Sequence, residues 1–146
     1  MFPSRHILLG GLFTLVVWMF APNLNPFYLA VIFLSSFLID FDHFVVGVIR
    51  TGKLNLRDIY DYHEQQDKIK IREKTKGITK KGDFHLFHTI EFHVLIGVLG
   101  IFFAPLFYVF IGMVFHSLID LFSLIRGDEI YRREYFFFNW IRKRFD

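Results

Sequence analysis

Two long blocks of the chain, residues 6–49 and 82–125, contain no lysine or arginine. All 17 positively charged residues fall at Arg5, within residues 50–81, or from Arg126 onward. A transmembrane helix needs about 20 mostly apolar residues, so each block is long enough for two spans. The composition points the same way, because 53% of the residues are hydrophobic. We therefore expect one all-α membrane domain comprising residues 1–146.

Helix-breaking residues divide each block into two predicted spans. Residues 21–26, which include Pro22 and Pro26, and the pair Ala104-Pro105 form short uncharged turns. We predict transmembrane helices over residues 7–21, 27–49, 84–103 and 106–125, which makes four spans in two hairpins. A cleaved signal peptide is the alternative for residues 1–21, and Pro22 directly after the candidate cleavage site disfavours it.

The distribution of positive charge predicts the orientation of these spans. If there are four spans, Arg5, the polar loop 50–83 and the tail 131–146 all lie on one side of the membrane. The positive-inside rule makes that side cytoplasmic. We expect an integral protein of the cell membrane with both termini in the cytoplasm.

The loop and the tail are predicted to contact the bilayer surface. The tail 131–146 mixes aromatic and basic residues, which is typical of an interfacial helix. In the loop, residues 58–67 suit a short helix, and the alternation in residues 68–72 suits a strand or an interfacial segment. The positive residues of the loop favour anionic head groups as partners, and its few aromatic residues disfavour nucleic acid.

Acidic residues and histidines of the predicted spans gather near the cytoplasmic ends. Acids inside lipid are costly and by default mark a functional site. Carboxylates mixed with imidazoles, with no lysine or arginine among them, are typical of a metal site rather than of ion pairs. Cysteine is absent, which excludes thiolate ligands and disulfides. The predicted metal ligands are Asp40, Asp42, His43, His88, His93, His116 and Asp120, with His6 as a further ligand or as a hydrogen-bond partner of one.

Helical spacing places some of these ligands on common faces. His116 and Asp120 are four residues apart, and Asp40 and His43 are three apart, so each pair shares a face. Asp42 points elsewhere on an ideal helix. Its role would then require a second metal, a hydrogen bond to a ligand, or a local distortion of the helix.

The spacing of His88 and His93 is less favourable, because five residues correspond to about 140° around an ideal helix. Both can bind one site only if the helix begins between them, bulges, or passes between two ions. Seven ligands exceed the roughly four of a single zinc site, so we expect one or two divalent ions, Zn²⁺ first, with Mn²⁺ or Fe²⁺ as alternatives. His63 and His85 are assigned to packing outside the site.

Four motifs resemble those of a known family. The chain contains, in this order, an early histidine, Asp-x-Asp-His at 40–43, a His-x₄-His segment at 88–93 and His-x₃-Asp at 116–120. These are similar to motifs of the small inner-membrane metal-dependent hydrolases described as LexA-binding, over nearly the whole chain. Two positions depart from that family pattern: Thr89 stands where the family has Arg, and Phe92 where it has Thr.

The resemblance implies a membrane-bound metal-dependent hydrolase that acts at the cytoplasmic face on a lipid or lipid-linked substrate, expected to be a phosphoester. An arginine in the His-x₄-His motif would be a natural phosphate clamp. Thr89 therefore weakens the case for a phosphoester, unless Arg126 or a lysine of the loop substitutes.

Glu91 is the candidate general base, because it is an acid within reach that the family motif does not require. Its alternative role is to accept a hydrogen bond from a ligating imidazole. Two other classes of protein stay open. One is a metal or proton transporter or sensor subunit, and the other is a structural metalloprotein whose ion only holds the helices together.

Overall fold

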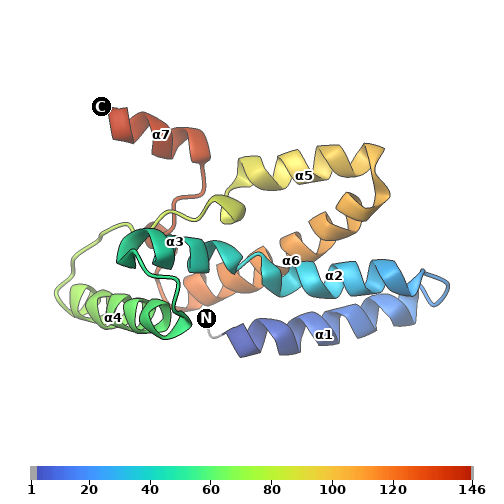
Figure 1. The fold of residues 1–146 in the computed structure, drawn as a ribbon, viewed down its shortest axis with the longest axis horizontal. Coiled ribbons are helices and arrows are strands. Elements are labelled where there is room, and N and C mark those ends of the chain that lie inside the picture. The colour runs from blue at the N-terminus through green and yellow to red at the C-terminus, as the bar shows by residue number, and fades with distance from the viewer. Residues whose placement is uncertain (1–2, 146) are drawn as a thin grey trace.

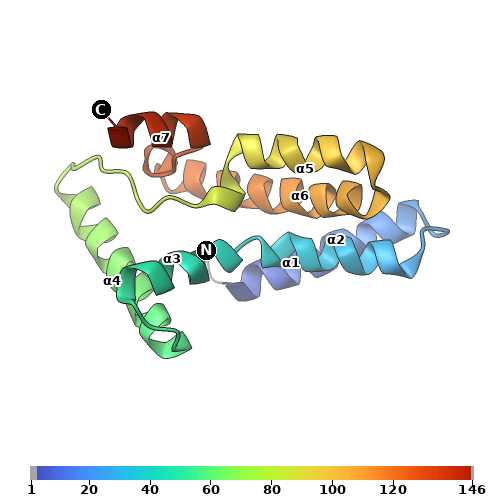
Figure 2. The ribbon, with the colours of Figure 1, turned by 45° about the horizontal axis from the view of Figure 1, so that its top comes forward.

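Helices form the regular structure of residues 3–145, the part of the chain that the computed structural model describes (Figure 1). α1 (Pro3–Phe20) and α2 (Pro26–Leu38) make a first hairpin, and α5 (Ile90–Phe102) and α6 (Ala104–Arg126) make a second. α6 contacts both α2 and α5, and Figure 2 shows it between them. Residues 3–145 contain no strand, which confirms the all-α prediction.

Two helical stretches are long and apolar enough to cross a membrane: Pro26–Thr51 and Ala104–Arg126, each with a mean hydropathy of 1.9. The apolar helices Ser4–Phe20 and Ile90–Phe102 are shorter. The third predicted span was placed too early, because α5 begins at Ile90 rather than at residue 84. Thr89 caps this helix by accepting a hydrogen bond from the backbone N–H of Phe92, and a short 3₁₀ helix, η1 (Leu86–His88), precedes it.

The second predicted span is bent, where we expected a continuous helix over residues 27–49. α2 ends at Leu38, a turn follows at residues 39–40, and α3 (Phe41–Thr51) continues beyond it. The backbone N–H of His43 donates to the carbonyl of Asp40, which starts the new helix. No proline or glycine stands at this bend, so the sequence carries none of the usual signals of a helix break.

The polar loop contains a long helix, α4 (Leu56–Thr75), which packs on α3. A Cβ atom at Gly47 of α3 would lie 2.5 Å from Cγ2 of Ile59, so only glycine allows this approach. Residues 68–72 do not form a strand, which was one of the two predictions for them, because they continue α4. Lys70 there pairs with Glu129, with 2.6 Å between Nζ and Oε2.

The tail folds back along the loop and along the start of α5. It contains η2 (Ile130–Arg132) and α7 (Phe137–Phe145), so the α-helix expected in the tail covers only its end, and Asp146 lies outside the described residues. The backbone N–H of Gly82 donates to the carbonyl of Arg132 at 2.8 Å, and that of Ile90 to the carbonyl of Tyr135 at 2.9 Å. These two bonds fix the backbone on both sides of Arg133.

α2 and α6 approach each other closely at Gly112. A Cβ atom at this position would lie 2.5 Å from the carbonyl oxygen of Ile32 and would collide with the hydroxyl of Ser35. Small residues at such crossings are typical of helix contacts in membranes. This close contact also fixes where His116, one turn further along α6, lies against α2.

Candidate metal centre

Four predicted ligands from three segments converge at one place. Asp40, His88, His116 and Asp120 each bring one ligand atom to within 4.8 Å of the other three. Asp40 lies at the bend after α2, His88 ends η1, and the other two lie one turn apart on α6. Both histidines and Asp120 are buried, and Asp40 is half-buried.

The distances between these ligand atoms match the edges of a small coordination polyhedron. Nε2 of His88 lies 3.2 Å from Nε2 of His116. Oδ1 of Asp40 lies 3.5 and 3.4 Å from these two nitrogens, and Oδ2 of Asp120 lies 3.7 and 3.5 Å from them. A tetrahedral zinc ion with bonds near 2.0–2.1 Å separates its ligand atoms by about 3.3 Å. The residues therefore fit an ion of this size.

Hydrogen bonds at the other ring nitrogens fix both imidazoles with Nε2 facing this centre. Nδ1 of His116 lies 2.8 Å from the carbonyl oxygen of Ser36, to which it can only donate. Nδ1 of His88 lies 3.0 Å from Oδ2 of Asp42 and donates to that carboxylate. Each Nε2 then carries a lone pair, and two lone pairs 3.2 Å apart repel unless a cation or a proton lies between them.

Asp42, which points away from Asp40 on an ideal helix, forms a hydrogen bond to a potential ligand, one of the three roles considered for it. Its Oδ2 also accepts a hydrogen bond from the backbone N–H of Phe87, at 3.1 Å. The side chain thus holds η1 and orients the His88 ring from behind. Carboxylates in this position fix the tautomer of a ligating histidine and make it a stronger ligand.

Arg133 also reaches the centre, which the sequence did not predict. Its Nη2 donates to Oδ2 of Asp120 at 2.6 Å, and its side chain is 15% exposed. The expectation that no arginine lies among the acids was therefore wrong. Asp40, Asp42 and Asp120 carry three negative charges when ionised, and one guanidinium leaves two uncompensated. A divalent ion would balance this charge, which is costly to bury alone.

His6 completes the buried side of the centre. Its ring stacks on that of His116 with 4.1 Å between centroids, and its Nε2 lies 3.3 Å from Oδ1 of Asp120. The ring is 1% exposed, and its Nδ1 has no hydrogen-bond partner among the described residues. The early histidine of the sequence motif is therefore in contact with two of the four converging residues, His116 and Asp120.

A second group of potential ligands shares His88 with the first. Asp42, His43 and His88 also bring ligand atoms within 4.8 Å of one another. His43 is the more open member, with a side chain that is 37% exposed. His85 lies beside this group, because its ring packs on that of His43 at 3.8 Å between centroids. The nearby His63 binds the carbonyl oxygen of His43 through Nε2, at 2.9 Å.

Within residues 3–145, two predicted site residues, His93 and Glu91, belong to neither of these groups of potential ligands. Nδ1 of His93 lies 2.8 Å from the carbonyl oxygen of Thr89, and its Nε2 lies 2.9 Å from the hydroxyl of Ser117. Nδ1 is thus used at the start of α5 itself, and Nε2 joins α5 to α6. The helix begins between His88 and His93, and their side chains diverge.

Glu91 faces the tail instead of the metal centre. Its Oε2 accepts a hydrogen bond from the backbone N–H of Phe137 at 2.9 Å, and its Oε1 accepts one from Phe138 at 3.4 Å. The carboxylate thereby caps the N-terminus of α7. This position gives Glu91 a structural task and gives no support to its prediction as general base.

The comparisons with known proteins add no assignment: no protein-family model, no curated protein and no solved structure matches the chain. The function is therefore argued from the geometry of the centre.

Proposed function

We propose that the chain is a membrane-embedded, metal-dependent hydrolase that acts on a lipid or lipid-linked phosphoester at the cytoplasmic face. In this proposal α1 and α5 also cross the apolar layer, so that four spans in two hairpins place both termini in the cytoplasm. The shorter helices would require local thinning of the bilayer. Membership of the family of small inner-membrane hydrolases of the LexA-binding type is part of the same proposal.

One observation carries the metal assignment. Two imidazole nitrogens with free lone pairs face each other across 3.2 Å, with two carboxylate oxygens at comparable distances. Asp40, His88, His116 and Asp120 would hold one ion, which we propose to be Zn²⁺, with Mn²⁺ or Fe²⁺ as alternatives. Asp42 and His43 would hold a second ion if two are bound. Such an ion lowers the pKa of a bound water and polarises the bond to be cleaved.

The remaining residues would orient the ligands and the substrate. Asp42 and the carbonyl of Ser36 hold the two imidazoles with Nε2 inward. Arg133 supplies the guanidinium that the sequence motif lacks at Thr89, and it is suited to bind a phosphate oxygen. If only one ion is bound, His43, the half-exposed histidine beside Asp40, is our candidate for exchanging a proton with water.

Metal content of the detergent-purified protein tests this proposal. We expect a stoichiometric divalent ion in the wild type and its loss in His116→Ala and Asp40→Asn. Glu91→Gln is the matched control, since its carboxylate faces α7, and it should keep the ion. A panel of phosphoester lipids, assayed with and without chelator, tests the reaction.

The outcomes separate the alternatives. Ion content that is unchanged in His116→Ala and Asp40→Asn would exclude the centre. Turnover that survives removal of the ion would exclude the mechanism. A bound ion without turnover on any ester would favour a structural metal site.

A further inference from the structure

A groove of about 610 Å³ runs between α5 and α6 and reaches the candidate metal centre. Its apolar walls come from one face of each helix, including Val94 and Ile101 on α5 and Phe110 and Leu118 on α6. Two polar residues of the tail, Arg133 and Tyr135, line the groove where it meets His88. The groove therefore joins an apolar channel to a charged end.

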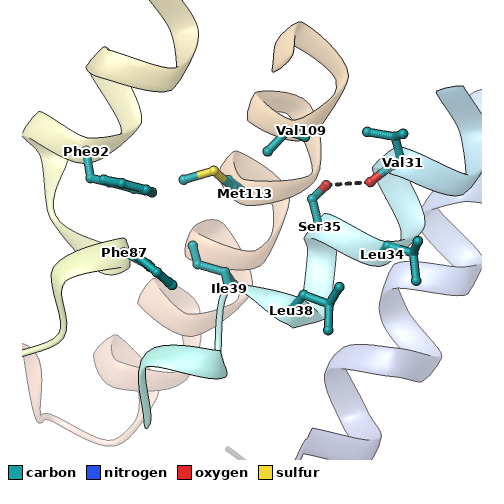
Figure 3. A pocket seen from close by; sticks show the side chains of 9 residues that line it. All are labelled: Val31, Leu34, Ser35, Leu38, Ile39, Phe87, Phe92, Val109 and Met113. Atoms are coloured by element: carbon teal, nitrogen blue, oxygen red, sulfur yellow. Dashed lines mark hydrogen bonds between the residues drawn. The ribbon is translucent and has the colours of Figure 1, made fainter. Parts of the chain in front are cut away.

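A second groove, on the other side of α5, has no charged end. It encloses about 370 Å³ between α2, α5 and α6 and is lined almost wholly by apolar side chains (Figure 3). Its one hydroxyl, that of Ser35, donates to the carbonyl of Val31 on the same helix. Nothing in this second groove would hold a charged group, so we do not assign it a ligand.

The charged end of the larger groove has unused hydrogen-bonding capacity. A guanidinium carries five N–H donors, and one nitrogen of Arg133, Nη2, binds Asp120. The hydroxyl of Tyr135 is buried and has no hydrogen-bond partner in the part of the chain that the structure describes. An unpaired buried hydroxyl is costly, so a ligand acceptor at this position would stabilise the site.

The length of the groove matches that of one acyl chain. Its lining on α5 extends from Ile90 to Ile101, which is about 16 Å along a helix. One leaflet contributes about 15 Å to the hydrocarbon core of a membrane. A single acyl chain could lie along the groove with its head at Arg133.

We propose that the groove between α5 and α6 holds one acyl chain of an anionic phospholipid, whose headgroup phosphate binds Arg133 and the Tyr135 hydroxyl beside the metal centre. The basic end of α7, which carries Arg142, Lys143 and Arg144, favours anionic lipid at this surface. The inference rests on the proposed function for the chemical step after binding, and it names the substrate class of that site.

The two parts of the lipid play different roles. Lipid tails are as apolar as the groove, so placing a chain there adds little affinity. The groove gives access, because it lets the chain stay in apolar surroundings while the head reaches a buried centre. The phosphate contacts provide selectivity, since charge-assisted bonds to arginine are strong and directional.

Photo-crosslinking in phosphatidylcholine nanodiscs tests the proposal on the full-length protein. The probe is a phosphatidic acid that carries a diazirine near the end of one chain. We expect cross-links at Val98 and Ile101. Val94→Trp, which fills the groove near its charged end and excludes the chain, should lower them about tenfold. Leu95→Trp is the matched control, because Leu95 is 52% exposed and Val94 57%, and only Val94 lines the groove.

Two further arms complete the design. The matching phosphatidylcholine probe should label the groove weakly, and Arg133→Gln should abolish the preference for phosphatidic acid. Val98→Trp repeats the block if Val94→Trp fails to fold, as judged by gel filtration. Equal labelling of Val94→Trp and Leu95→Trp, or equal labelling by the two probes, would overturn the proposal. Groove labelling without lipid hydrolysis would support the groove and reject the hydrolase.

Discussion

The two hairpins carry the same short sequence near the candidate metal centre and use it differently. Leu38-Ile39-Asp40 follows Ser36 in the first, and Leu118-Ile119-Asp120 follows His116 in the second, at the same spacing. In the second hairpin the helix continues through Asp120 to Arg126. In the first, α2 ends at Leu38 and the chain turns at Asp40.

This difference decides how each hairpin supplies ligands. The unbroken α6 places His116 and Asp120 one turn apart on one face. At the equivalent of His116 the first hairpin has Ser36, whose backbone carbonyl accepts a hydrogen bond from His116. The bend then lets Asp40 face the first group of ligands while Asp42 supports His88 from behind. The second hairpin thus supplies two potential ligands, His116 and Asp120. The first supplies one, Asp40, together with Asp42, which orients His88.

The two aspartates of this repeated sequence should differ when each is changed to asparagine. Asp120→Asn removes the negative charge that pairs with the partly buried Arg133 guanidinium, and breaking a buried ion pair costs about 3 kcal/mol or more. Asp40→Asn has no such cationic partner and should cost less. We expect both variants to lose the ion and only Asp120→Asn to be strongly destabilised.

Denaturant unfolding in the presence of a chelator measures this difference without the contribution of bound metal. Arg133→Gln combined with Asp120→Asn should recover part of the stability, since the unpaired charge is removed. Equal unfolding free energies for the two single variants would show that Arg133 does not distinguish the hairpins.

A smaller effect is expected at Asp42, the residue that only the first hairpin provides. Asp42→Asn keeps the shape of the side chain but weakens its hold on His88 Nδ1. Loss of such a supporting carboxylate lowers metal affinity by about 10–100-fold. Titration with a competing chelator measures the affinity, and the ion should still bind at saturation. Complete loss of the ion would instead make Asp42 a direct ligand.

The smallest effect is expected from a change at Asp83, which binds the helices α3 and α4 that follow only the first hairpin. Nε and Nη2 of Arg50 donate to Oδ1 of Asp83, and the Tyr62 hydroxyl donates to Oδ2. Burial raises the pKa of Asp83, but the hydrogen bonds from Tyr62 and Arg50 outweigh it and leave the pKa below its usual value. Burial, followed by the bond to Asp83, raises the pKa of Tyr62 to about 12.

These shifts set the pH range in which Asp83 stabilises the fold. A lowered carboxyl pKa gives stability that is present above about pH 4 and is lost as the pH falls further. The raised pKa of Tyr62 gives stability that is present below about pH 10 and is lost at higher pH. Asp83→Asn should cost about 1 kcal/mol at pH 7, since Arg50 is largely exposed. The difference from the wild type, followed by denaturant unfolding, should shrink toward pH 3; a constant difference would contradict this prediction.

The sequence by itself determined the helical class, the two long apolar stretches and most of the converging residues. Cation-free blocks predict apolar helices because charge inside a membrane is costly. The spacing of four residues on a continuous helix places His116 and Asp120 on one face, and Asp40 and His88 are an acid and a histidine at a similar depth in the predicted spans. These are local properties, or follow from the thickness of the membrane.

Only the tertiary structure decided which of these residues face one another. Arg133 joins the centre because the tail is bound on either side of it by Gly82 and Ile90, a pairing between segments that no spacing within one helix reveals. The capping of α5 at Thr89 turned His93 away, and the start of α7 took the Glu91 carboxylate. Backbone groups at helix ends need partners, and where a side chain supplies one depends on which segments pack together.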